Sequence, residues 1–540
     1  MNKIFDNLGL MLDCSRNAVM RPEMVKKMID LTSKMGYDFI MLYTEDTYEV
    51  NNQPYFGHFR GRYSKEELKE LADYAQNKNM ELIPCIQTLA HIDGLLKWNC
   101  YHDIIDCDDI LLVGNERVYE LIDGMFATIS ECFNTKTVHI GMDEAEFVGL
   151  GKYLKINGYR ADRTQIILEH LNKVSKIADK YDFNLLMWGD MFYKLAGPTQ
   201  KDDGTFTVDS TIKEKIPSNV TLVYWDYYSK DSKNYDNCFK VYNQIEENLW
   251  FAGGTWTWTG FAPHMTHTEN VTSAAIDACK NNNIRTFLTT LWGDDGGECS
   301  MFAALPNLYW LSENVKGNTD KQKIKNGFKE FIGIDYDEYK LLELPNTPNT
   351  DGDINNPDKY MLYNDLLMGR LDSTVNGDEG ARYAECSKIL SKISIESEYS
   401  YLFDTLKALC DVLAVKYDLG VKIREAYKSK NLRDIKHTLN LVNEVRERVD
   451  VFYNAYERQW FIENKPQGFD VFSMRIGALL QRIKYTANCL KKLIDGETDR
   501  IEELEEVVLD ITCCNSEKKA IFYPFWDEIV SSNVINMRRN

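Results

Sequence analysis

The sequence predicts an α/β protein, a (β/α)8 TIM barrel followed by an all-α C-terminal domain. Eight short apolar, β-prone runs between residues 8 and 294 alternate with amphipathic segments of helical length, and eight strands close such a barrel. A stretch rich in Pro, Asn, Asp and Gly follows at 345–358, and only helical patterns come after it. The 540 residues accommodate a barrel of about 250–340 residues beside a second domain.

The predicted strands end in polar or aromatic residues. In a barrel, the C-terminal ends of all strands converge on one rim, where active sites lie. The pattern therefore predicts the position of the active site before any motif is considered. The eight strands are 8–15, 39–46, 80–88, 137–144, 184–190, 220–227, 249–256 and 285–294. The residues at their ends are Asp13, Glu45, Asp46, Gln87, Asp143, Glu144, Trp188, Asp190, the run 225–228, Trp256 and the run 292–294.

We expect three parts along the chain: a catalytic barrel over 1–340, a linker or long loop over 341–358, and a helical domain over 359–540. The last part carries apolar residues at helical spacing with many Lys and Glu between them, which is typical of a helical bundle. A packed structural domain is favoured, with a coiled-coil or homodimer role as the alternative. The predicted helical segments are 380–397, 400–428, 432–463, 469–495 and 499–511.

Composition and charge restrict the partners. The formal net charge of -20 argues against nucleic acid and anionic membranes, which a surface of the same sign repels. A neutral small molecule or oligosaccharide fits better. The 13 cysteines contain no CxxC pair, which is typical of reduced thiols. The N-terminus lacks the apolar region of a signal peptide, and no run reaches transmembrane length. We therefore expect a cytoplasmic protein.

The strongest local signal is VHIGMDEAE at 138–146, an apolar strand that ends in adjacent carboxylates. Where the chain leaves the pleat, both Asp143 and Glu144 can line the rim. Crowding two acids raises the pKa of one through desolvation and like-charge repulsion, so the pair can serve acid and base roles. The same pattern also occurs in metal sites and in salt-bridged rims.

HIGMDE at 139–144 resembles the His-[Ile/Leu]-Gly-x-Asp-Glu motif of glycoside hydrolase family 20, the β-N-acetylhexosaminidases. Four further segments resemble that family in the same order: LMLDCSRN at 10–17, LYTED at 42–46, IQTLAHIDGLLKW at 86–98 and LWGDDGGE at 291–298. TEDTYEV, RGRYSKEEL and IPCIQTLAH most resemble the bacterial subgroup with a C-terminal helical domain.

The resemblance implies a retaining exo-β-N-acetylhexosaminidase that uses substrate-assisted catalysis and no cofactor. The 2-acetamido oxygen of the substrate attacks the anomeric carbon and gives an oxazolinium intermediate. Glu144 is expected to be the general acid and then the base, and Asp143 to orient the acetamido N–H. The expected partner is an oligosaccharide or small molecule with a terminal β-linked GlcNAc or GalNAc.

The same resemblance implies the binding residues. Arg16 and Asp294 would bind sugar hydroxyls, and His91 and Glu45 or Asp46 would form supporting polar contacts around Glu144 or Arg16. His139, inside its strand, is expected to be structural. The aromatic assignments depart from the family pattern, because the tyrosine that contacts the acetamido carbonyl is absent from TWTWTG after the seventh strand. Tyr227 is the preferred substitute and Tyr228 the alternative; Trp188, Trp256 and Trp292 would wall the pocket, with Trp225 and Trp258 as competitors.

Three alternatives stay open at this point. A metal-dependent barrel enzyme would place a divalent cation on Glu45, Asp143, Glu144 and His91. A non-catalytic barrel would only bind sugar. An O-GlcNAcase-like or chitinase-like barrel would share the acetamido chemistry.

Overall fold

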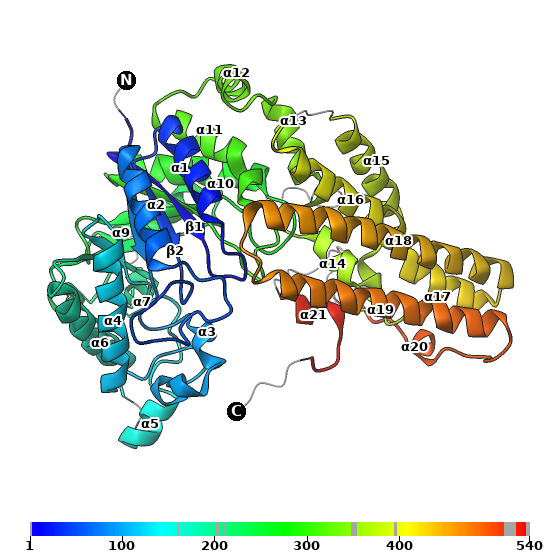
Figure 1. The fold of residues 1–540 in the computed structure, drawn as a ribbon, viewed down its shortest axis with the longest axis horizontal. Coiled ribbons are helices and arrows are strands. Elements are labelled where there is room, and N and C mark those ends of the chain that lie inside the picture. Colours follow the sequence, from blue (N-terminus) through cyan, green and yellow to red (C-terminus); the bar gives the residue numbers. More distant parts are fainter. Residues whose placement is uncertain are drawn as a thin grey trace. The chain divides into compact units, whose positions relative to one another are not determined.

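The structure is a computed structural model, and it describes residues 3–159, 161–195, 197–200, 206–209, 211–346, 354–393, 397–511 and 525–535. Eight parallel strands close into a barrel in the order β1-β10-β9-β8-β5-β4-β3-β2, which confirms the predicted fold class (Figure 1). All eight predicted strands are present. They are β1 (Asn7–Asp13), β2 (Phe39–Tyr43), β3 (Glu81–Cys85), β4 (Thr137–His139), β5 (Asn184–Trp188), β8 (Val220–Trp225), β9 (Trp250–Gly254) and β10 (Thr286–Leu291).

Helices connect successive barrel strands and cover the outside of the sheet (Figure 1). A two-stranded hairpin, β6 (Thr199–Gln200) and β7 (Phe206–Thr207), interrupts the connection after α7. The helices of this part are α1 (Pro22–Met35), α2 (Lys65–Asn77), α3 (Asp93–Leu96), α4 (Glu116–Cys132), α5 (Lys152–Asn157), α6 (Arg163–Asp179), α7 (Asp190–Leu195), α8 (Thr211–Lys215), α9 (Ser232–Tyr242), α10 (Met265–Asn281) and α11 (Leu305–Val315).

Local sequence signals explain where the first helices begin. Pro22 occupies the first turn of α1, where its missing N–H costs nothing. Ser64 caps α2 by accepting a hydrogen bond from the Glu67 backbone N–H, and the Glu67 carboxylate accepts one from the Ser64 backbone N–H. In the barrel wall, a Cβ on Gly9 would lie 2.1 Å from the Phe39 ring, so this close contact between β1 and β2 requires glycine.

The chain divides into two compact units. The first comprises Met1–Thr255, Thr268–Trp292 and Asn307–Asp320 and contains the barrel strands. The second comprises Trp256–His267, Gly293–Pro306 and Lys321–Asn540, so it includes the segments that follow β9 and β10. The boundaries expected at 340 and 359 stay predictions. Residues 341–346 form a 3₁₀ helix, and 347–353 lie outside the described residues.

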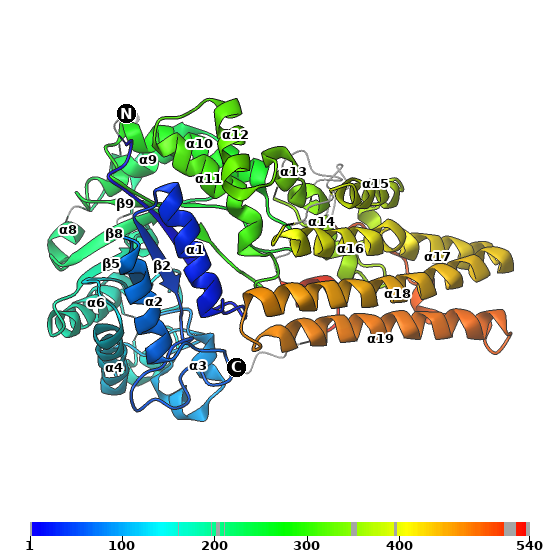
Figure 2. The ribbon, with the colours of Figure 1, turned by 45° about the horizontal axis from the view of Figure 1, so that its top comes forward.

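The second unit is helical, as expected. Within it, α16, α18 and α19 pack side by side (Figure 2), and an aromatic cluster of Phe261, Phe452, Tyr456 and Phe472 fills its core. Its helices are α12 (Lys321–Ile332), α13 (Tyr336–Lys340), α14 (Pro357–Tyr363), α15 (Glu379–Ser391), α16 (Ser400–Lys416), α17 (Leu419–Ser429), α18 (Leu432–Glu463), α19 (Phe469–Ile494), α20 (Glu502–Glu505) and α21 (Trp526–Val530).

Two helical predictions need correction. The segment predicted over 400–428 is broken between α16 and α17 at Asp418, which starts a new helix. The helix predicted over 499–511 is reduced to the single turn α20. Glutamates crowd this turn, and repulsion among neighbouring carboxylates in a short helix disfavours its continuation. Of the predicted segment 380–397, residues 394–396 lie outside the described part.

A buried ionic cluster holds the segment after β10 within the second unit. The Lys359 ammonium, fully buried, lies 2.6 Å from Asp295 Oδ2 and 2.7 Å from Glu298 Oε2. The Arg475 guanidinium lies 2.9 Å from Asp295 Oδ1 and 2.8 Å from Glu298 Oε1. Two cations and two carboxylates compensate one another, which is how charges are tolerated away from water.

None of the helices in the described ranges has both the length and the apolar character needed to cross a membrane. The cytoplasmic location and the homodimer stay predictions.

Candidate active site

The chain leaves the barrel strand well before the two adjacent acids. Strand β4 ends at His139, and the backbone then adopts positive φ at Gly141 (69°), Met142 (69°) and Glu144 (50°). A Cβ on Gly141 would lie 1.9 Å from Gln87 Oε1, and that same oxygen accepts a hydrogen bond of 3.2 Å from Met142 N. This turn explains how two consecutive carboxylates lie on the same rim.

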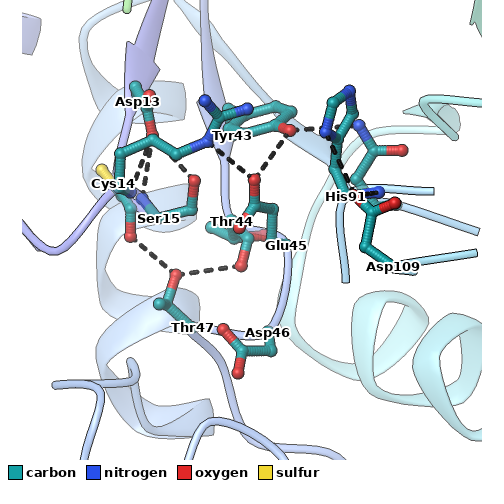
Figure 3. Close-up of polar contacts among 12 residues, drawn as sticks. Asp13, Cys14, Ser15, Tyr43, Thr44, Glu45, Asp46, Thr47, His91 and Asp109 are labelled. Carbon is teal, nitrogen blue, oxygen red and sulfur yellow. Dashed lines mark hydrogen bonds and ion pairs between the residues drawn. The ribbon is translucent and has the colours of Figure 1, made fainter. Parts of the chain in front are cut away.

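His91 lies beside both carboxylates. Its Nε2 is 3.2 Å from Asp143 Oδ2 and 3.6 Å from Glu144 Oε2. On the other edge of the ring, Nδ1 is 3.6 Å from Asp109 Oδ2, and the same oxygen accepts from the His91 backbone N–H at 2.9 Å (Figure 3). Gln87 Nε2 donates to Asp143 Oδ1 at 2.9 Å. Both oxygens of Asp143 are therefore engaged.

These contacts separate the pKa values of the two acids. Burial alone would raise the pKa of Asp143, but the charge and hydrogen bond of His91 lower it to about 2. Burial opposes protonation of His91, yet Asp143 raises its pKa to about 10. For Glu144, burial and then the charge of Asp143 raise the pKa above its ordinary value. The site at neutral pH thus holds an ionised Asp143, an imidazolium and an acid that retains its proton more readily than usual.

Asp190, the first residue of α7, supports the turn that carries Asp143 and Glu144. Its Oδ2 accepts a hydrogen bond of 3.1 Å from the Glu144 backbone N–H, and the Lys194 ammonium is 3.8 Å away. Its Oδ1 is buried and has no hydrogen-bond partner among the described residues. Burial, followed by the charge of Asp143, raises the pKa of Asp190 to about 7.

Replacement of Asp190 by Asn is expected to stabilise the protein more at pH 8 than at pH 5. The folded pKa is about 7 and the ordinary value 3.8, so between them the folded state keeps a proton that the unfolded chain has lost. Stability therefore falls as pH rises through this window, and an amide removes that dependence. The gain should grow by about 1–3 kcal/mol from pH 5 to pH 8, measured by urea unfolding.

The matched control is Asp182→Asn, because the side chain of Asp182 is 92% exposed. Its difference from the parent protein should not vary with pH. A difference for Asp190→Asn that is constant from pH 5 to pH 8 would contradict the raised pKa.

A second cluster of polar side chains holds Arg16 in position. Arg16 Nε donates to Glu45 Oε1 at 2.9 Å, and the Tyr43 hydroxyl donates to the same oxygen at 3.0 Å. At the end of β1, Asp13 Oδ1 accepts from the Ser15 backbone and hydroxyl, both at 2.9 Å, and from Arg16 N at 3.3 Å (Figure 3). Gln87 Nε2 also donates to the Tyr43 hydroxyl at 3.1 Å, so this group is hydrogen-bonded to the Asp143 group.

Asp46 forms an ion pair with Arg60, next to the pair of Arg16 and Glu45. Arg60 Nε lies 3.1 Å from Asp46 Oδ1, and Arg60 Nη2 lies 3.7 Å from Glu45 Oε2. Of the two acids predicted to support the site, Glu45 contacts both Arg16 and Arg60, and Asp46 contacts Arg60.

Aromatic side chains from β2, from β5 and from the residue after β10 lie close together near these groups. The ring centroids of Trp188 and Trp292 are 6.2 Å apart, and those of Tyr43 and Trp292 are 4.8 Å apart. Tyr227 is 6% exposed and lies within hydrogen-bonding reach of the Trp292 and Thr290 side chains. The rings of Tyr227 and Trp225 stack at 5.4 Å, whereas Tyr228 is 54% exposed.

Trp256 and Asp294 belong to the second unit, so their predicted contacts with substrate stay predictions. Trp256 stacks on Trp258 with centroids 3.9 Å apart, and its indole N–H donates to the Trp258 carbonyl at 3.1 Å. Asp294 directly precedes Asp295, which the buried ionic cluster fixes.

His139 is fully buried, and burial lowers its pKa to about 3. Its Nδ1 accepts a hydrogen bond of 3.1 Å from Gly141 N. A neutral ring that holds the turn agrees with the expected structural role.

Sequence reasoning assigned no role to Gln87, Tyr43, Asp109 or Asp190. Gln87 and Asp190 lie at the ends of predicted strands, so the pattern predicted their position on the rim. It did not predict their contacts. Asp109 lies in a long connection that no strand pattern marks. In the described part of the chain, no group of three or more His, Cys, Asp or Glu side chains is arranged to hold a metal ion.

Two rim carboxylates with opposite pKa shifts suit the hydrolysis of glycosidic bonds, because one group must donate a proton while the other stays charged. Fold and site together are those of a glycoside hydrolase. The chain belongs to glycoside hydrolase family 20. The family model "Glycosyl hydrolase family 20, catalytic domain" matches residues 5–286, and the "Glycoside Hydrolase 20C C-terminal domain" matches residues 336–522. Both confirm the resemblance seen in the sequence.

Individual relatives are distant. Hexosaminidase D of Bos taurus is 24% identical over 216 residues, which cover 38% of this chain and 58% of that protein. Beta-hexosaminidase 3 of Arabidopsis thaliana is 23% identical over 235 residues, 40% of this chain and 42% of that protein. The matches thus span less than two thirds of these relatives. A solved β-N-acetylhexosaminidase from Bacteroides fragilis is 19% identical over 60% of this chain and 70% of its own, with a TM-score of 0.46.

Proposed function

We propose that the chain is a retaining exo-β-N-acetylhexosaminidase that removes terminal β-linked GlcNAc or GalNAc by substrate-assisted catalysis. The observation that carries this proposal is that Asp143 and Glu144 both lie beside His91 and have opposite pKa shifts. The pKa of Asp143 is lowered to about 2, and that of Glu144 is raised. Family 20 enzymes use the substrate's acetamido group in place of an enzyme nucleophile. Two of its relatives, hexosaminidase D of Bos taurus and beta-hexosaminidase 3 of Arabidopsis thaliana, are named for this class of activity.

In the first step, the acetamido oxygen forms a bond to the anomeric carbon as the glycosidic C–O bond breaks. Glu144 gives its proton to the departing oxygen, which its raised pKa and half-exposed position suit. Asp143 accepts a hydrogen bond from the acetamido N–H and so directs the oxygen at the carbon. Its negative charge also stabilises the positive charge that develops on the oxazolinium ring.

In the second step, water attacks the anomeric carbon and opens the oxazolinium ring. Glu144, now ionised, takes the proton from this water and is ready for the next cycle. Two inversions at the same carbon give overall retention of configuration. His91 keeps Asp143 ionised through both steps, since the imidazolium loses its proton only near pH 10.

The remaining rim groups would hold the terminal sugar. Arg16, oriented by Glu45 and by the turn at Asp13, presents a guanidinium suited to sugar hydroxyls. Trp188 and Trp292 would pack on the acetamido methyl and the apolar face of the ring. Tyr227, beside Trp292, would donate to the acetamido carbonyl.

Aryl β-GlcNAc and aryl β-GalNAc are expected to be hydrolysed at least ~10³-fold faster than the matching aryl β-glucoside, because glucose lacks the intramolecular nucleophile. The measurement is kcat/KM for the three glycosides with the same leaving group. A matched aryl α-GlcNAc serves as the control for stereochemistry and should not be hydrolysed.

Equal turnover of the glucoside would overturn the substrate-assisted mechanism. Binding of sugar without any hydrolysis would favour the non-catalytic alternative. A thiazoline analogue of the intermediate should bind more tightly than the product, since analogues of high-energy states bind better than ground states.

A further inference from the structure

The turn at 141–144, which carries the two rim acids, has a backbone conformation that most residues avoid. Gly141, Met142 and Glu144 have positive φ values of 69°, 69° and 50°. This left-handed region is unfavourable for a residue that carries a Cβ, so it persists only where the surrounding structure holds it. The position of the Glu144 side chain therefore depends on the contacts that hold this backbone.

Side chains from three strand ends accept the N–H groups of this turn. The N–H groups of residues 141 and 142 donate to His139 Nδ1 at 3.1 Å and to Gln87 Oε1 at 3.2 Å. The N–H of Glu144 donates to Asp190 Oδ2 at 3.1 Å. Of the three acceptors, Asp190 is thus the one that holds the backbone of Glu144 itself.

Asp190 makes this contact at a cost to the fold. Its Oδ1 is buried and has no hydrogen-bond partner in the part of the chain that the structure describes, and the Lys194 ammonium lies 3.8 Å from Oδ2. Burial of a carboxylate with an unsatisfied oxygen is destabilising. A residue that lowers stability beside a reactive group indicates a role in function.

Ionisable groups on three elements act on Asp190. Asp143 and Glu144 do so from the turn after β4, Lys194 from α7, and the phenol of Tyr242 from α9. The interaction between two acids is mutual, so a negative charge on Asp190 favours the protonated form of Glu144. Asp190 can therefore affect both the position of Glu144 and its hold on the proton.

We propose that Asp190 is a positioning residue for Glu144, which fixes the backbone of this acid by a hydrogen bond and favours its proton by charge. The inference rests on the proposed function, because it takes Glu144 as the group that protonates the leaving oxygen. A displaced acid transfers its proton poorly. The effect of Asp190 should therefore be largest for substrates whose leaving group needs that proton.

The test compares two aryl glycosides of β-GlcNAc. Phenol is a poor leaving group that needs the proton, whereas 2,4-dinitrophenol departs without it. In Asp190→Ala, kcat/KM for the phenyl glycoside should fall about 10–100-fold, and kcat/KM for the dinitrophenyl glycoside less than about 3-fold. In Asp190→Asn the amide oxygen can still accept the Glu144 N–H, so the phenyl glycoside should lose less than about 5-fold on the pH plateau.

The pH profile tests the role of the charge. The high-pH limb of kcat/KM for the phenyl glycoside follows loss of the Glu144 proton. In Asp190→Asn this limb should begin about 0.5–1 pH unit below that of the parent protein, because the amide carries no charge that favours the proton.

A double variant tests whether Asp190 acts through Glu144. When Glu144→Gln is already present, the further change Asp190→Ala should lower kcat/KM for the phenyl glycoside less than about 2-fold, because no acid is left to position. A role confined to the fold would give the same loss in both backgrounds.

Asp106→Ala is the matched control. Asp106 is buried like Asp190, and its two oxygens accept from Gly149 N and Tyr153 N, both at 2.7 Å, further along the same connection. Its ratio of kcat/KM for the two glycosides should equal that of the parent protein. Melting temperatures show whether each variant is folded.

Equal losses of the two glycosides in Asp190→Ala, or a high-pH limb that stays in place in Asp190→Asn, would overturn the inference while leaving the proposed activity intact. Failure of the parent protein to hydrolyse either glycoside would instead overturn the proposed activity. The parent protein alone distinguishes the two failures.

Discussion

Replacement of Glu144 by Gln should lower kcat/KM for β-GlcNAc oligosaccharides about 10²–10⁴-fold, the usual contribution of general acid–base catalysis. The amide keeps the shape of the side chain but cannot give a proton to the leaving oxygen. Aryl glycosides with acidic phenols should lose less, because their leaving groups depart without full protonation. The measurement is kcat/KM against leaving-group pKa for the parent and the variant.

Glu146→Gln is the matched control. Glu146 lies two residues away, is half-exposed and pairs with Lys194, so its loss should change kcat/KM less than about 3-fold. The high-pH limb of the parent profile, which reports loss of the Glu144 proton, should disappear in Glu144→Gln and persist in Glu146→Gln. Full activity of Glu144→Gln on oligosaccharides would show that another group is the acid.

The predictability of this fold comes from the regular alternation of apolar strands and amphipathic helices. Each strand carries its own apolar run, so all eight could be located from local sequence. The position of the rim could be predicted from these strands, because the strand ends share one edge of the barrel. The helix predicted over 499–511 was wrong for a different reason. Whether such a short segment stays helical depends on the balance between charge repulsion within it and its packing against the rest of the protein, and this packing is not visible in the sequence.

Side-chain partnerships were less predictable than positions. The sequence predicts Asp143 and Glu144 on one rim, but nothing local in it shows that the His91 ring lies between these two carboxylates and Asp109. Asp190 follows the pattern of a strand end, yet its raised pKa arises from burial and from the charge of Asp143. Such shifts depend on residues far apart in sequence.

The segments after β9 and β10 show a further limit. The strand ends predicted Trp256 and Asp294 on the barrel rim, which stays a prediction, but not that their segments belong to the unit that contains the C-terminal helices. Asp295 and Glu298 pair there with Lys359 and Arg475, residues more than 60 positions further along the chain. No periodicity in the sequence reports such ion pairs.

Replacement of Asp143 by Asn is expected to lower kcat/KM about 10²–10³-fold for every β-GlcNAc substrate, whatever the leaving group. The amide can still accept a hydrogen bond, but it carries no charge to stabilise the oxazolinium ring. The variant should also lose the interaction that raises the pKa of His91 to about 10, so the His91 imidazole should titrate several units lower when followed by NMR.

Asp109→Asn is the matched control, because Asp109 contacts the opposite edge of the same imidazole at 3.6 Å and donates nothing to the proposed chemistry. It should lower kcat/KM less than about 10-fold and leave the His91–Asp143 pair in place. If Asp143→Asn and Asp109→Asn lost activity equally, positioning of His91 would explain the loss. A larger loss for Asp143→Asn, independent of the leaving group, would show that the Asp143 carboxylate stabilises the positive charge that forms on the substrate's own acetamido group.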